Sequence, residues 1–312
     1  MSWRVLVSDE VDQVLLSTLE DSGMHVDYRP DIERQDLVSS VGGYNVLVVR
    51  SRTRVDREVI DAGRALKVIA RAGIGLDTID TEYARSKGIK VVFAPGSSTR
   101  SVTELTFAAF LSISRSFCTL STMAREGGKF LKKTGREVSG GKTLGIIGFG
   151  RIGQDIASVA SAFGMEVLAY DVVRNEEAAE RLGVSLVALE DLLRGGSDYI
   201  SINVTVSPGQ PPLIGKKEFS AMGRRPVISN TSRAAAVDGN ALLEALKSGV
   251  VSVYYTDVMW NEPPREKFEM DLLRMENFVV TPHIGAQTEE AKRRVAMETA
   301  SNIVKAWRGG EI

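Results

Sequence analysis

The sequence feature that most constrains the fold is a glycine-rich turn in the middle of the chain. Residues 142–147, Lys-Thr-Leu-Gly-Ile-Ile, have the pattern of a buried strand, and residues 154–163 have a helical pattern. Between them stands Gly-Phe-Gly-Arg-Ile-Gly, residues 148–153, which is G-x-G-x-x-G in a strand–turn–helix context. Such glycines permit a tight turn, close approach of the backbone to a pyrophosphate, and close packing of helix on strand. The sequence therefore predicts a dinucleotide-binding unit, but nearly half of the chain precedes it.

An acidic residue follows this turn where an adenosine ribose would need one. Asp171 closes the predicted strand 166–171, and a carboxylate there accepts hydrogen bonds from the ribose diol of NAD and repels the extra phosphate of NADP. Arg174 keeps NADP open as the alternative. We predict NAD as the cofactor. The predicted contacts in this region are Gly148, Phe149, Gly150, Arg151, Ile152, Gly153 and Asp171.

Composition excludes several classes of function. The net charge of the 312 residues is -1, so no global basic field attracts nucleic acid or an anionic membrane. No apolar run reaches the ~18 residues of a membrane span, and the N-terminus has no signal-peptide pattern. The single cysteine, Cys118, excludes an internal disulfide and a cysteine-based metal cluster. We therefore expect a cytoplasmic protein without a metal site.

The order of predicted elements indicates two α/β domains. Strands alternate with helices in the first part of the chain and again after the long helix 101–114, which predicts parallel sheets covered on both faces. The final helix, 289–307, has no strand after it, and we expect it to return to the first domain. The predicted boundaries are therefore 1–97 with 285–312 for the first domain and 98–284 for the inserted NAD-binding Rossmann domain. The predicted strands are 4–8, 25–28, 45–50, 67–71, 90–94, 143–147, 166–170, 199–203, 227–230, 252–256 and 278–280.

Three strand ends of the second domain carry residues capable of acid–base or anion chemistry. Arg233 follows the strand 227–230, Glu262 follows 252–256, and His283 follows 278–280. Ligands bind at the carboxyl ends of the strands in open parallel sheets, so these three side chains are expected in one crevice. Taken singly, the arginine could be a surface residue, the glutamate a loop charge and the histidine a helix cap. The other histidine, His25, is expected to be structural or on the surface.

The same blocks resemble the signature motifs of the D-isomer-specific 2-hydroxyacid dehydrogenases. The matching segments are Asn-Thr-Ser-Arg at 230–233, Asp257 with Glu-Pro at 262–263, and Thr-Pro-His-Ile-Gly at 281–285, while residues 71–80 resemble the substrate loop. The resemblance covers essentially the whole chain and is closest to short-form D-3-phosphoglycerate dehydrogenases. It implies two Rossmann-like domains, with a flavodoxin-like, split substrate domain interrupted by the NAD-binding domain.

The resemblance also assigns roles at the reacting end of the cofactor. It implies that His283 is the acid–base group, that Glu262 binds the far ring nitrogen and stabilises the imidazolium, and that Arg233 clamps the substrate carboxylate. An unperturbed imidazole titrates near pH ~6.5, which suits proton transfer in both directions. Asp257 is expected to face the nicotinamide carboxamide. The other residues expected at the cofactor here are Asn203, Thr231, Gly285 and His283 itself.

The resemblance implies a doubly anionic substrate. Backbone N–H groups of Gly73, Ile74 and Gly75 are expected to hold its carboxylate, and Arg50 and Arg71 match positions that contact a substrate phosphate. Ser51 is also expected to bind the substrate. The expected reaction is oxidation of 3-phospho-D-glycerate to 3-phosphohydroxypyruvate, a step of serine biosynthesis. A glyoxylate or hydroxypyruvate reductase is the alternative enzyme, and an NAD(H)-sensing protein like the corepressors of this fold is the alternative of another class.

The family resemblance also implies how the chain assembles and how it is controlled. We expect a homodimer formed through the cofactor domains, with the region 101–114 contributing, and we expect neither nucleic acid nor a membrane as a partner. Because the sequence ends shortly after the last predicted helix, we expect no regulatory domain and no inhibition by serine.

Overall fold

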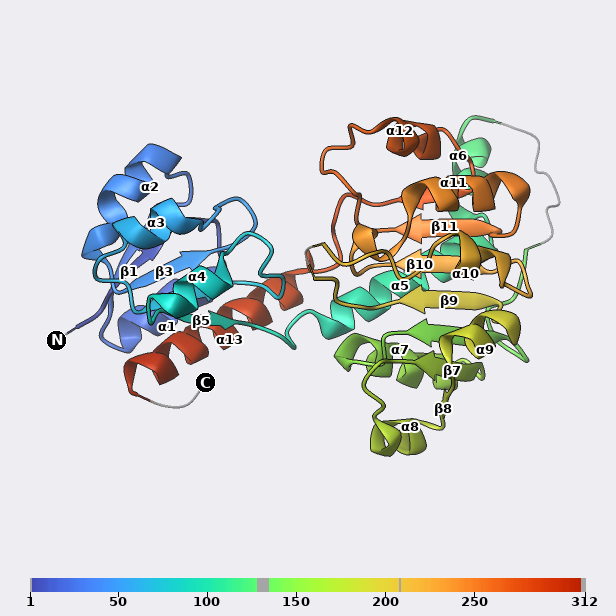
Figure 1. Ribbon diagram of the computed structural model, residues 1–312, viewed down its shortest axis with the longest axis horizontal. Helices are drawn as coiled ribbons and strands as arrows, with labels where there is room; N and C mark the ends of the chain where they lie inside the picture. The colour runs from blue at the N-terminus through green and yellow to red at the C-terminus, as the bar shows by residue number, and fades with distance from the viewer. Residues whose placement is uncertain (1, 128–134, 208, 310–312) are drawn as a thin grey trace. The chain divides into compact units, whose positions relative to one another are not determined.

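The computed structural model describes residues 2–127, 135–207 and 209–309, and the chain divides into two compact units. The first unit consists of Met1–Ser98 together with Ala286–Ile312, and the second consists of Thr99–Gly285 (Figure 1). Each unit has its own parallel sheet and its own hydrophobic core.

The first unit is built on a five-stranded parallel sheet with the order β2-β1-β3-β4-β5. This is the flavodoxin-like order, which confirms the predicted fold class. The strands are short runs of branched apolar residues, as expected for a parallel sheet covered on both faces. They span Arg4–Val7 (β1), His25–Tyr28 (β2), Val46–Val49 (β3), Val68–Arg71 (β4) and Lys90–Phe93 (β5).

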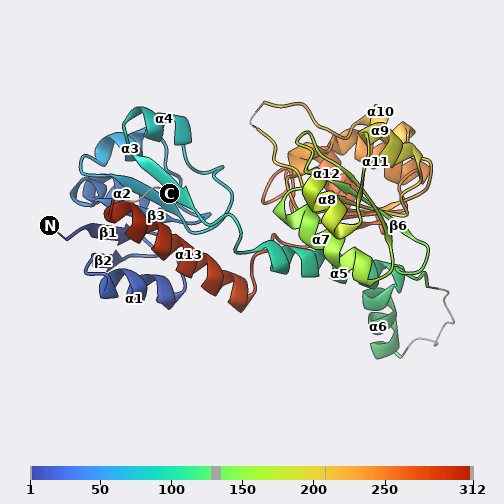
Figure 2. The ribbon, with the colours of Figure 1, turned by 90° about the horizontal axis from the view of Figure 1, so that it is seen from below.

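Alternate side chains of these strands belong to two separate hydrophobic cores, one on each face of the sheet. Val5, Val46 and Val68 pack with one pair of helices, α1 (Gln13–Asp21) and α13 (Glu289–Trp307). The intervening strand residues pack against α2 (Arg34–Ser40), α3 (Arg57–Ala62) and α4 (Thr81–Ser86) on the opposite face (Figure 2). The final helix α13 therefore completes the first unit, because the chain returns to it after forming the whole of the second.

The second unit has a seven-stranded parallel sheet with the order β12-β11-β10-β9-β6-β7-β8. The order reverses between β6 and β9, and this switch point is where an open α/β sheet binds its ligand. The sequence predicted six of these strands and missed β8, which has two residues and is too short to show a period. The strands are Thr143–Ile147 (β6), Glu166–Tyr170 (β7), Ser185–Leu186 (β8), Tyr199–Ile202 (β9), Val227–Asn230 (β10), Val253–Thr256 (β11) and Phe278–Val280 (β12).

Helices cover both faces of this sheet as well. One face packs against α5 (Thr99–Ser114), α7 (Arg151–Ala162) and α8 (Glu176–Leu182). The opposite face packs against α9 (Leu189–Arg194), α10 (Lys216–Ser220), α11 (Gly239–Ser248) and α12 (Lys267–Leu273). A further helix, α6 (Phe117–Arg125), contributes no buried residue among those described.

In the part of the chain that the structure describes, no helix is long and apolar enough to cross a bilayer. The same residues contain no cluster of three or more His, Cys, Asp or Glu side chains arranged to hold a metal ion. Cys118 is a free, exposed thiol on α6.

Candidate active site

The glycine-rich turn leads from β6 into α7, and two of its glycines are required by the packing. Gly148 has a φ of 96°, and a β-carbon added there would lie 2.5 Å from the carbonyl oxygen of Asn203. A β-carbon at Gly153 would lie 2.2 Å from the carbonyl oxygen of Gly148. Backbone atoms cannot move aside as a flexible side chain does. A larger residue at Gly153 therefore forces α7 away from the end of β6, and one at Gly148 forces the turn away from the segment after β9.

The middle glycine of the turn, Gly150, has a different environment. A β-carbon there would have no other protein atom within 4 Å. Gly150 is also the N-cap of α7, and because glycine has no side chain it cannot cap the N–H groups of the first turn. The first turn of a helix presents N–H groups and a partial positive charge to whatever lies in front of it. The open approach at Gly150 therefore fits a pyrophosphate lying against the helix N-terminus.

Asp171, just after β7, lies against the same turn. Its two carboxylate oxygens accept hydrogen bonds from the backbone N–H groups of Phe149, at 2.6 Å, and Val173, at 3.0 Å. Arg174 is engaged elsewhere, because its guanidinium pairs with Glu176 at 2.7 Å and donates to the carbonyl of Leu186. The carboxylate is thus the charged group beside the turn, which fits the ribose diol of NAD rather than the phosphate of NADP.

Asn230, at the carboxyl end of β10, fixes the backbone around Arg233. Asn230 is fully buried, and its amide nitrogen donates to the carbonyl oxygen of Arg233 at 3.0 Å and to the hydroxyl of Tyr254 at 3.1 Å. Its amide oxygen accepts from both the N–H and the hydroxyl of Ser232. The hydroxyl oxygen of Thr231, in the same turn, is buried without a hydrogen-bond partner, so it remains available to a bound ligand.

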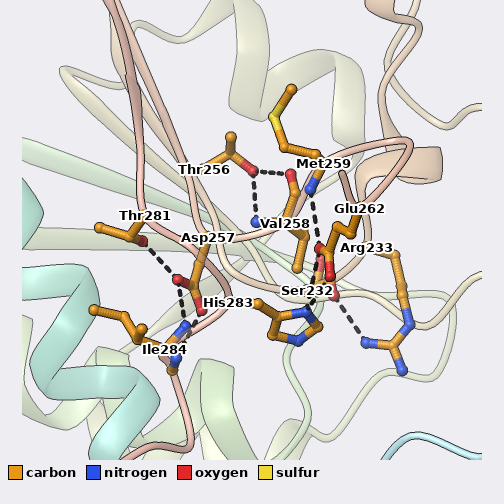
Figure 3. Close-up of polar contacts among 11 residues, drawn as sticks. Ser232, Arg233, Thr256, Asp257, Val258, Met259, Glu262, Thr281, His283 and Ile284 are labelled. Carbon is orange, nitrogen blue, oxygen red and sulfur yellow. Dashed lines mark hydrogen bonds and ion pairs between the residues drawn. The ribbon is translucent and has the colours of Figure 1, made fainter. Parts of the chain in front are cut away.

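Asp257, at the end of β11, holds the segment that carries the histidine. The side chain is 2% exposed, and its oxygens accept hydrogen bonds from the hydroxyl of Thr281 at 2.6 Å and from the N–H groups of Ile284 at 2.8 Å and Gly285 at 2.7 Å (Figure 3). The sequence predicted a contact of Asp257 with the cofactor, which stays a prediction. In the structure, its three bonds hold the residues on both sides of His283.

His283 and Glu262 form a pair at the surface of the second unit. The imidazole Nδ1 lies 3.0 and 3.2 Å from the two carboxylate oxygens of Glu262, and both side chains are about half exposed. His283 has a φ of 55°, a left-handed conformation that is uncommon for a residue other than glycine and is often found at functional sites. Arg233 lies beside the pair, and its guanidinium donates to the carbonyl oxygen of Ser232 at 2.9 Å (Figure 3). The predicted trio thus converges within one unit.

Apart from Arg233, the residues predicted to bind the substrate lie in the first unit, at the carboxyl ends of β3 and β4. The buried carboxylate of Asp9 accepts hydrogen bonds from the N–H groups of Arg50 and Thr53, and so shapes the loop after β3. Arg50 donates to the carbonyl of Glu10 at 3.1 Å, and Arg71 donates to the carbonyl of Gly75 at 2.8 Å. Ser51, Gly73 and Ile74 lie in the same two loops.

The neighbouring Arg52 uses all three of its guanidinium nitrogens on the protein. They contact the Asp9 carboxylate and the carbonyl oxygens of Ser8 and Ile32. Arg52 is therefore a structural residue of the loop.

The residues that hold the predicted site residues in place were not foreseen from the sequence. Asn230, Asp9 and Thr281 were not predicted to have a role, although each ends or follows a strand. Short polar side chains at such positions often bind the backbone a few residues further on, and this tendency was the available signal. Their partners across the sheet could not be read from the order of the residues.

Known proteins resemble the chain in both sequence and fold. Residues 107–285 match the model of the D-isomer-specific 2-hydroxyacid dehydrogenase NAD-binding domain. The chain is 40% identical over 305 residues to a hydroxypyruvate reductase of Thermotoga maritima, covering 97% of this chain and 98% of that protein. It is 39% identical over 307 residues to a D-3-phosphoglycerate dehydrogenase of Archaeoglobus fulgidus, but covers only 58% of that longer protein. A solved glyoxylate reductase from Paecilomyes thermophila is 28% identical, with a TM-score of 0.88 over 100% of this chain and 97% of that one.

Proposed function

Because the chain belongs to the D-isomer-specific 2-hydroxyacid dehydrogenases and has their NAD-binding domain, we propose that it interconverts a short D-2-hydroxy acid and the corresponding 2-oxo acid, with His283 as the acid–base group. The observation that carries the proposal is the contact of Nδ1 of His283 with the carboxylate of Glu262. When bound, NAD accepts the hydride during oxidation and NADH returns it during reduction.

The pair is suited to moving one proton. A hydrogen bond from Nδ1–H to Glu262 fixes the imidazole in the tautomer that leaves Nε2 as an acceptor. During oxidation, Nε2 of His283 takes the hydroxyl proton as the hydride leaves the carbon, and Glu262 stabilises the imidazolium that forms. During reduction, the same nitrogen returns the proton to the carbonyl oxygen.

Arg233 is assigned to the substrate carboxylate. A planar guanidinium binds a carboxylate through two parallel hydrogen bonds, and its charge also polarises an adjacent carbonyl. Asn230 supports this role because it binds the backbone of Arg233 and of the preceding turn. The remaining cofactor contacts are assigned to Asn203, Thr231, Asp257 and Gly285.

For the substrate we propose 3-phospho-D-glycerate, oxidised to 3-phosphohydroxypyruvate. The support is the pair of arginines, Arg50 and Arg71, at the carboxyl ends of adjacent strands of the first unit. Hydroxypyruvate is the second candidate, and one observation favours it. Arg52, a further cation of the same loop, is occupied by protein contacts, which leaves fewer charges for a phosphate.

A comparison of two arginine variants tests the substrate. Replacing Arg50 by Met should lower kcat/KM for 3-phosphohydroxypyruvate by about 10- to 100-fold, the usual loss of 1.5–3 kcal/mol for a hydrogen bond to a charged group. The value for hydroxypyruvate should change little. Arg54→Met removes an equal charge from the same loop at an exposed position and is the matched control.

The wild-type rates with NADH decide between the candidates. A higher kcat/KM for hydroxypyruvate than for its phosphorylated form, together with equal losses for both substrates in Arg50→Met, would show that the phosphate assignment is wrong. Tight NADH binding without turnover of any 2-oxo acid would instead support the sensor.

We also propose that the chain forms a homodimer through its second unit. The support is α6, which buries none of its described residues and exposes 68% of the surface of Phe117, together with Leu111 of α5, which is 40% exposed. Exposed apolar side chains are common at subunit interfaces. Sedimentation velocity on the intact chain measures the state, and a monomer at micromolar concentration would contradict the proposal.

A further inference from the structure

The loop that carries Glu262 is held by a single buried carboxylate, Glu269 of α12. This side chain has no exposed surface. One of its oxygens accepts from the N–H of Asn261 at 2.8 Å. The other accepts from the side-chain amide of Asn261 at 2.9 Å and from the N–H groups of Arg265 at 3.0 Å and Glu266 at 2.9 Å. Four donors from residues 261–266 thus converge on one carboxylate.

We propose that Glu269 is a positioning residue that holds Glu262 in place against His283. This inference rests on the proposed function, because it assigns to Glu269 the support of the acid–base pair. Glu262 directly follows Asn261, whose N–H and side-chain amide are both bound by Glu269. Two of the four anchored groups therefore lie one residue from the catalytic carboxylate.

A role in capping the helix explains only part of the arrangement. Glu269 is the N3 residue of α12, and its contact with the N–H of Glu266 completes a capping box. The remaining three donors belong to Asn261 and Arg265, outside the helix, and a capping box uses none of them. The additional bonds connect the helix to the preceding loop and fix the shape of the segment that carries Glu262.

The helix that supplies this anchor is itself fixed. The ring of Phe268, next to Glu269, fills the space over Gly239, where a β-carbon would lie 2.1 Å from the ring. Phe268 also meets Trp260 edge to face at 5.3 Å, and the indole nitrogen of Trp260 donates to the carbonyl of Val237 at 3.0 Å. Both sides of the loop are thus docked on the region where α11 begins.

The carboxylate is well adapted to accepting four hydrogen bonds. Burial alone would raise the pKa of Glu269, but the hydrogen bonds from Glu266, Arg265 and Asn261 outweigh it, so that the pKa lies below its usual value. Glu269 is therefore ionised at neutral pH, and an ionised carboxylate accepts hydrogen bonds at both oxygens without donating any. An amide cannot replace it, because an NH₂ group would face one or more of the same donors.

The Glu269→Gln variant tests the inference. The variant should lower kcat by about 10- to 100-fold, the effect of misplacing a catalytic group by roughly 1 Å. KM for the 2-oxo acid and Kd for NADH should stay within about 2-fold, because neither binding site is touched. A structural defect alone would instead weaken NADH binding and lower the fraction of active enzyme, with kcat per active site unchanged. Asp238→Ala, which removes the side-chain N-cap of α11 nearby, is the matched control for the loss of a helix cap.

A double-mutant cycle with Glu262→Gln shows whether Glu269 acts through Glu262. If it does, the double variant has the kcat of Glu262→Gln alone to within about 2-fold. If the two losses multiply, the inference is wrong. Asn261→Ala, which removes one of the four donors and leaves the buried charge, gives a second test should Glu269→Gln fail to fold. This variant should also lower kcat, and an unchanged kcat would contradict the inference.

The cycle separates this inference from the proposed function. An unchanged kcat in Glu262→Gln would overturn the acid–base pair, and with it the inference. A large loss in Glu262→Gln without a loss in Glu269→Gln would overturn the inference alone.

Discussion

Replacement of His283 by Asn should lower kcat by about 10²- to 10⁴-fold, the usual contribution of a general acid–base group. Asparagine is the suitable replacement because it tolerates the left-handed backbone that His283 adopts, with a φ of 55°, better than alanine does. The loop held by Asp257 should therefore keep its shape, and only the proton-transfer group is lost. Steady-state rates measure kcat, and quenching of protein fluorescence by NADH measures the cofactor affinity.

The chain provides its own control for this experiment. His25 is the only other histidine and is an exposed residue of β2 in the first unit. His25→Asn should leave kcat within about 2-fold, as surface substitutions away from a site usually do. A His283→Asn enzyme that retains a tenth or more of the wild-type kcat with unchanged NADH affinity would remove His283 from the mechanism.

Replacing two glycines of the same turn by alanine should affect the stability of the protein to very different extents. Gly153→Ala places a β-carbon 2.2 Å from a backbone oxygen, which should destabilise the protein by about 1–3 kcal/mol or more. At roughly 2–4 °C per kcal/mol for a unit of this size, the melting temperature should fall by several degrees. Gly150→Ala meets no other protein atom within 4 Å and should lower the melting temperature less, because it loses only the preference of the N-cap for glycine over alanine.

For Gly150→Ala, we expect the main effect on NADH affinity rather than on stability. Its α-carbon faces the space where a pyrophosphate fits, so the added methyl group should weaken NADH binding by about 10-fold or more, equivalent to ~1.4 kcal/mol. Thermal melting and NADH titration of both variants measure the two effects separately. A Gly150→Ala protein that binds NADH as the wild type does would contradict the placement of the pyrophosphate at this turn.

The sheets were predictable because their signals are local. Strands such as Thr143–Ile147 and Glu166–Tyr170 are continuous apolar runs bounded by turn residues, and both match their predicted bounds. The start of α7 was placed too late, at residue 154, because two glycines have poor helix propensity. The structure begins this helix at Arg151, since tertiary packing of Gly153 against Gly148 outweighs the local preference.

The candidate site was predictable only in part. The carboxyl ends of parallel strands lie along one edge, so Arg233, Glu262 and His283 were expected together, and the structure brings them together. The supporting contacts were not foreseen. Asp257 binds residues 27 and 28 positions away, and such pairs follow from the register of β11 and β12 rather than from spacing in the sequence. The catalytic roles themselves remain predictions.

Chiral analysis of the product formed from hydroxypyruvate or 3-phosphohydroxypyruvate with NADH tests the assigned reaction. We expect one NADH to be consumed for each 2-hydroxy acid formed, and the D-isomer to be the sole product. Formation of the L-isomer, of a mixture of both, or of no 2-hydroxy acid from either compound would overturn the assignment.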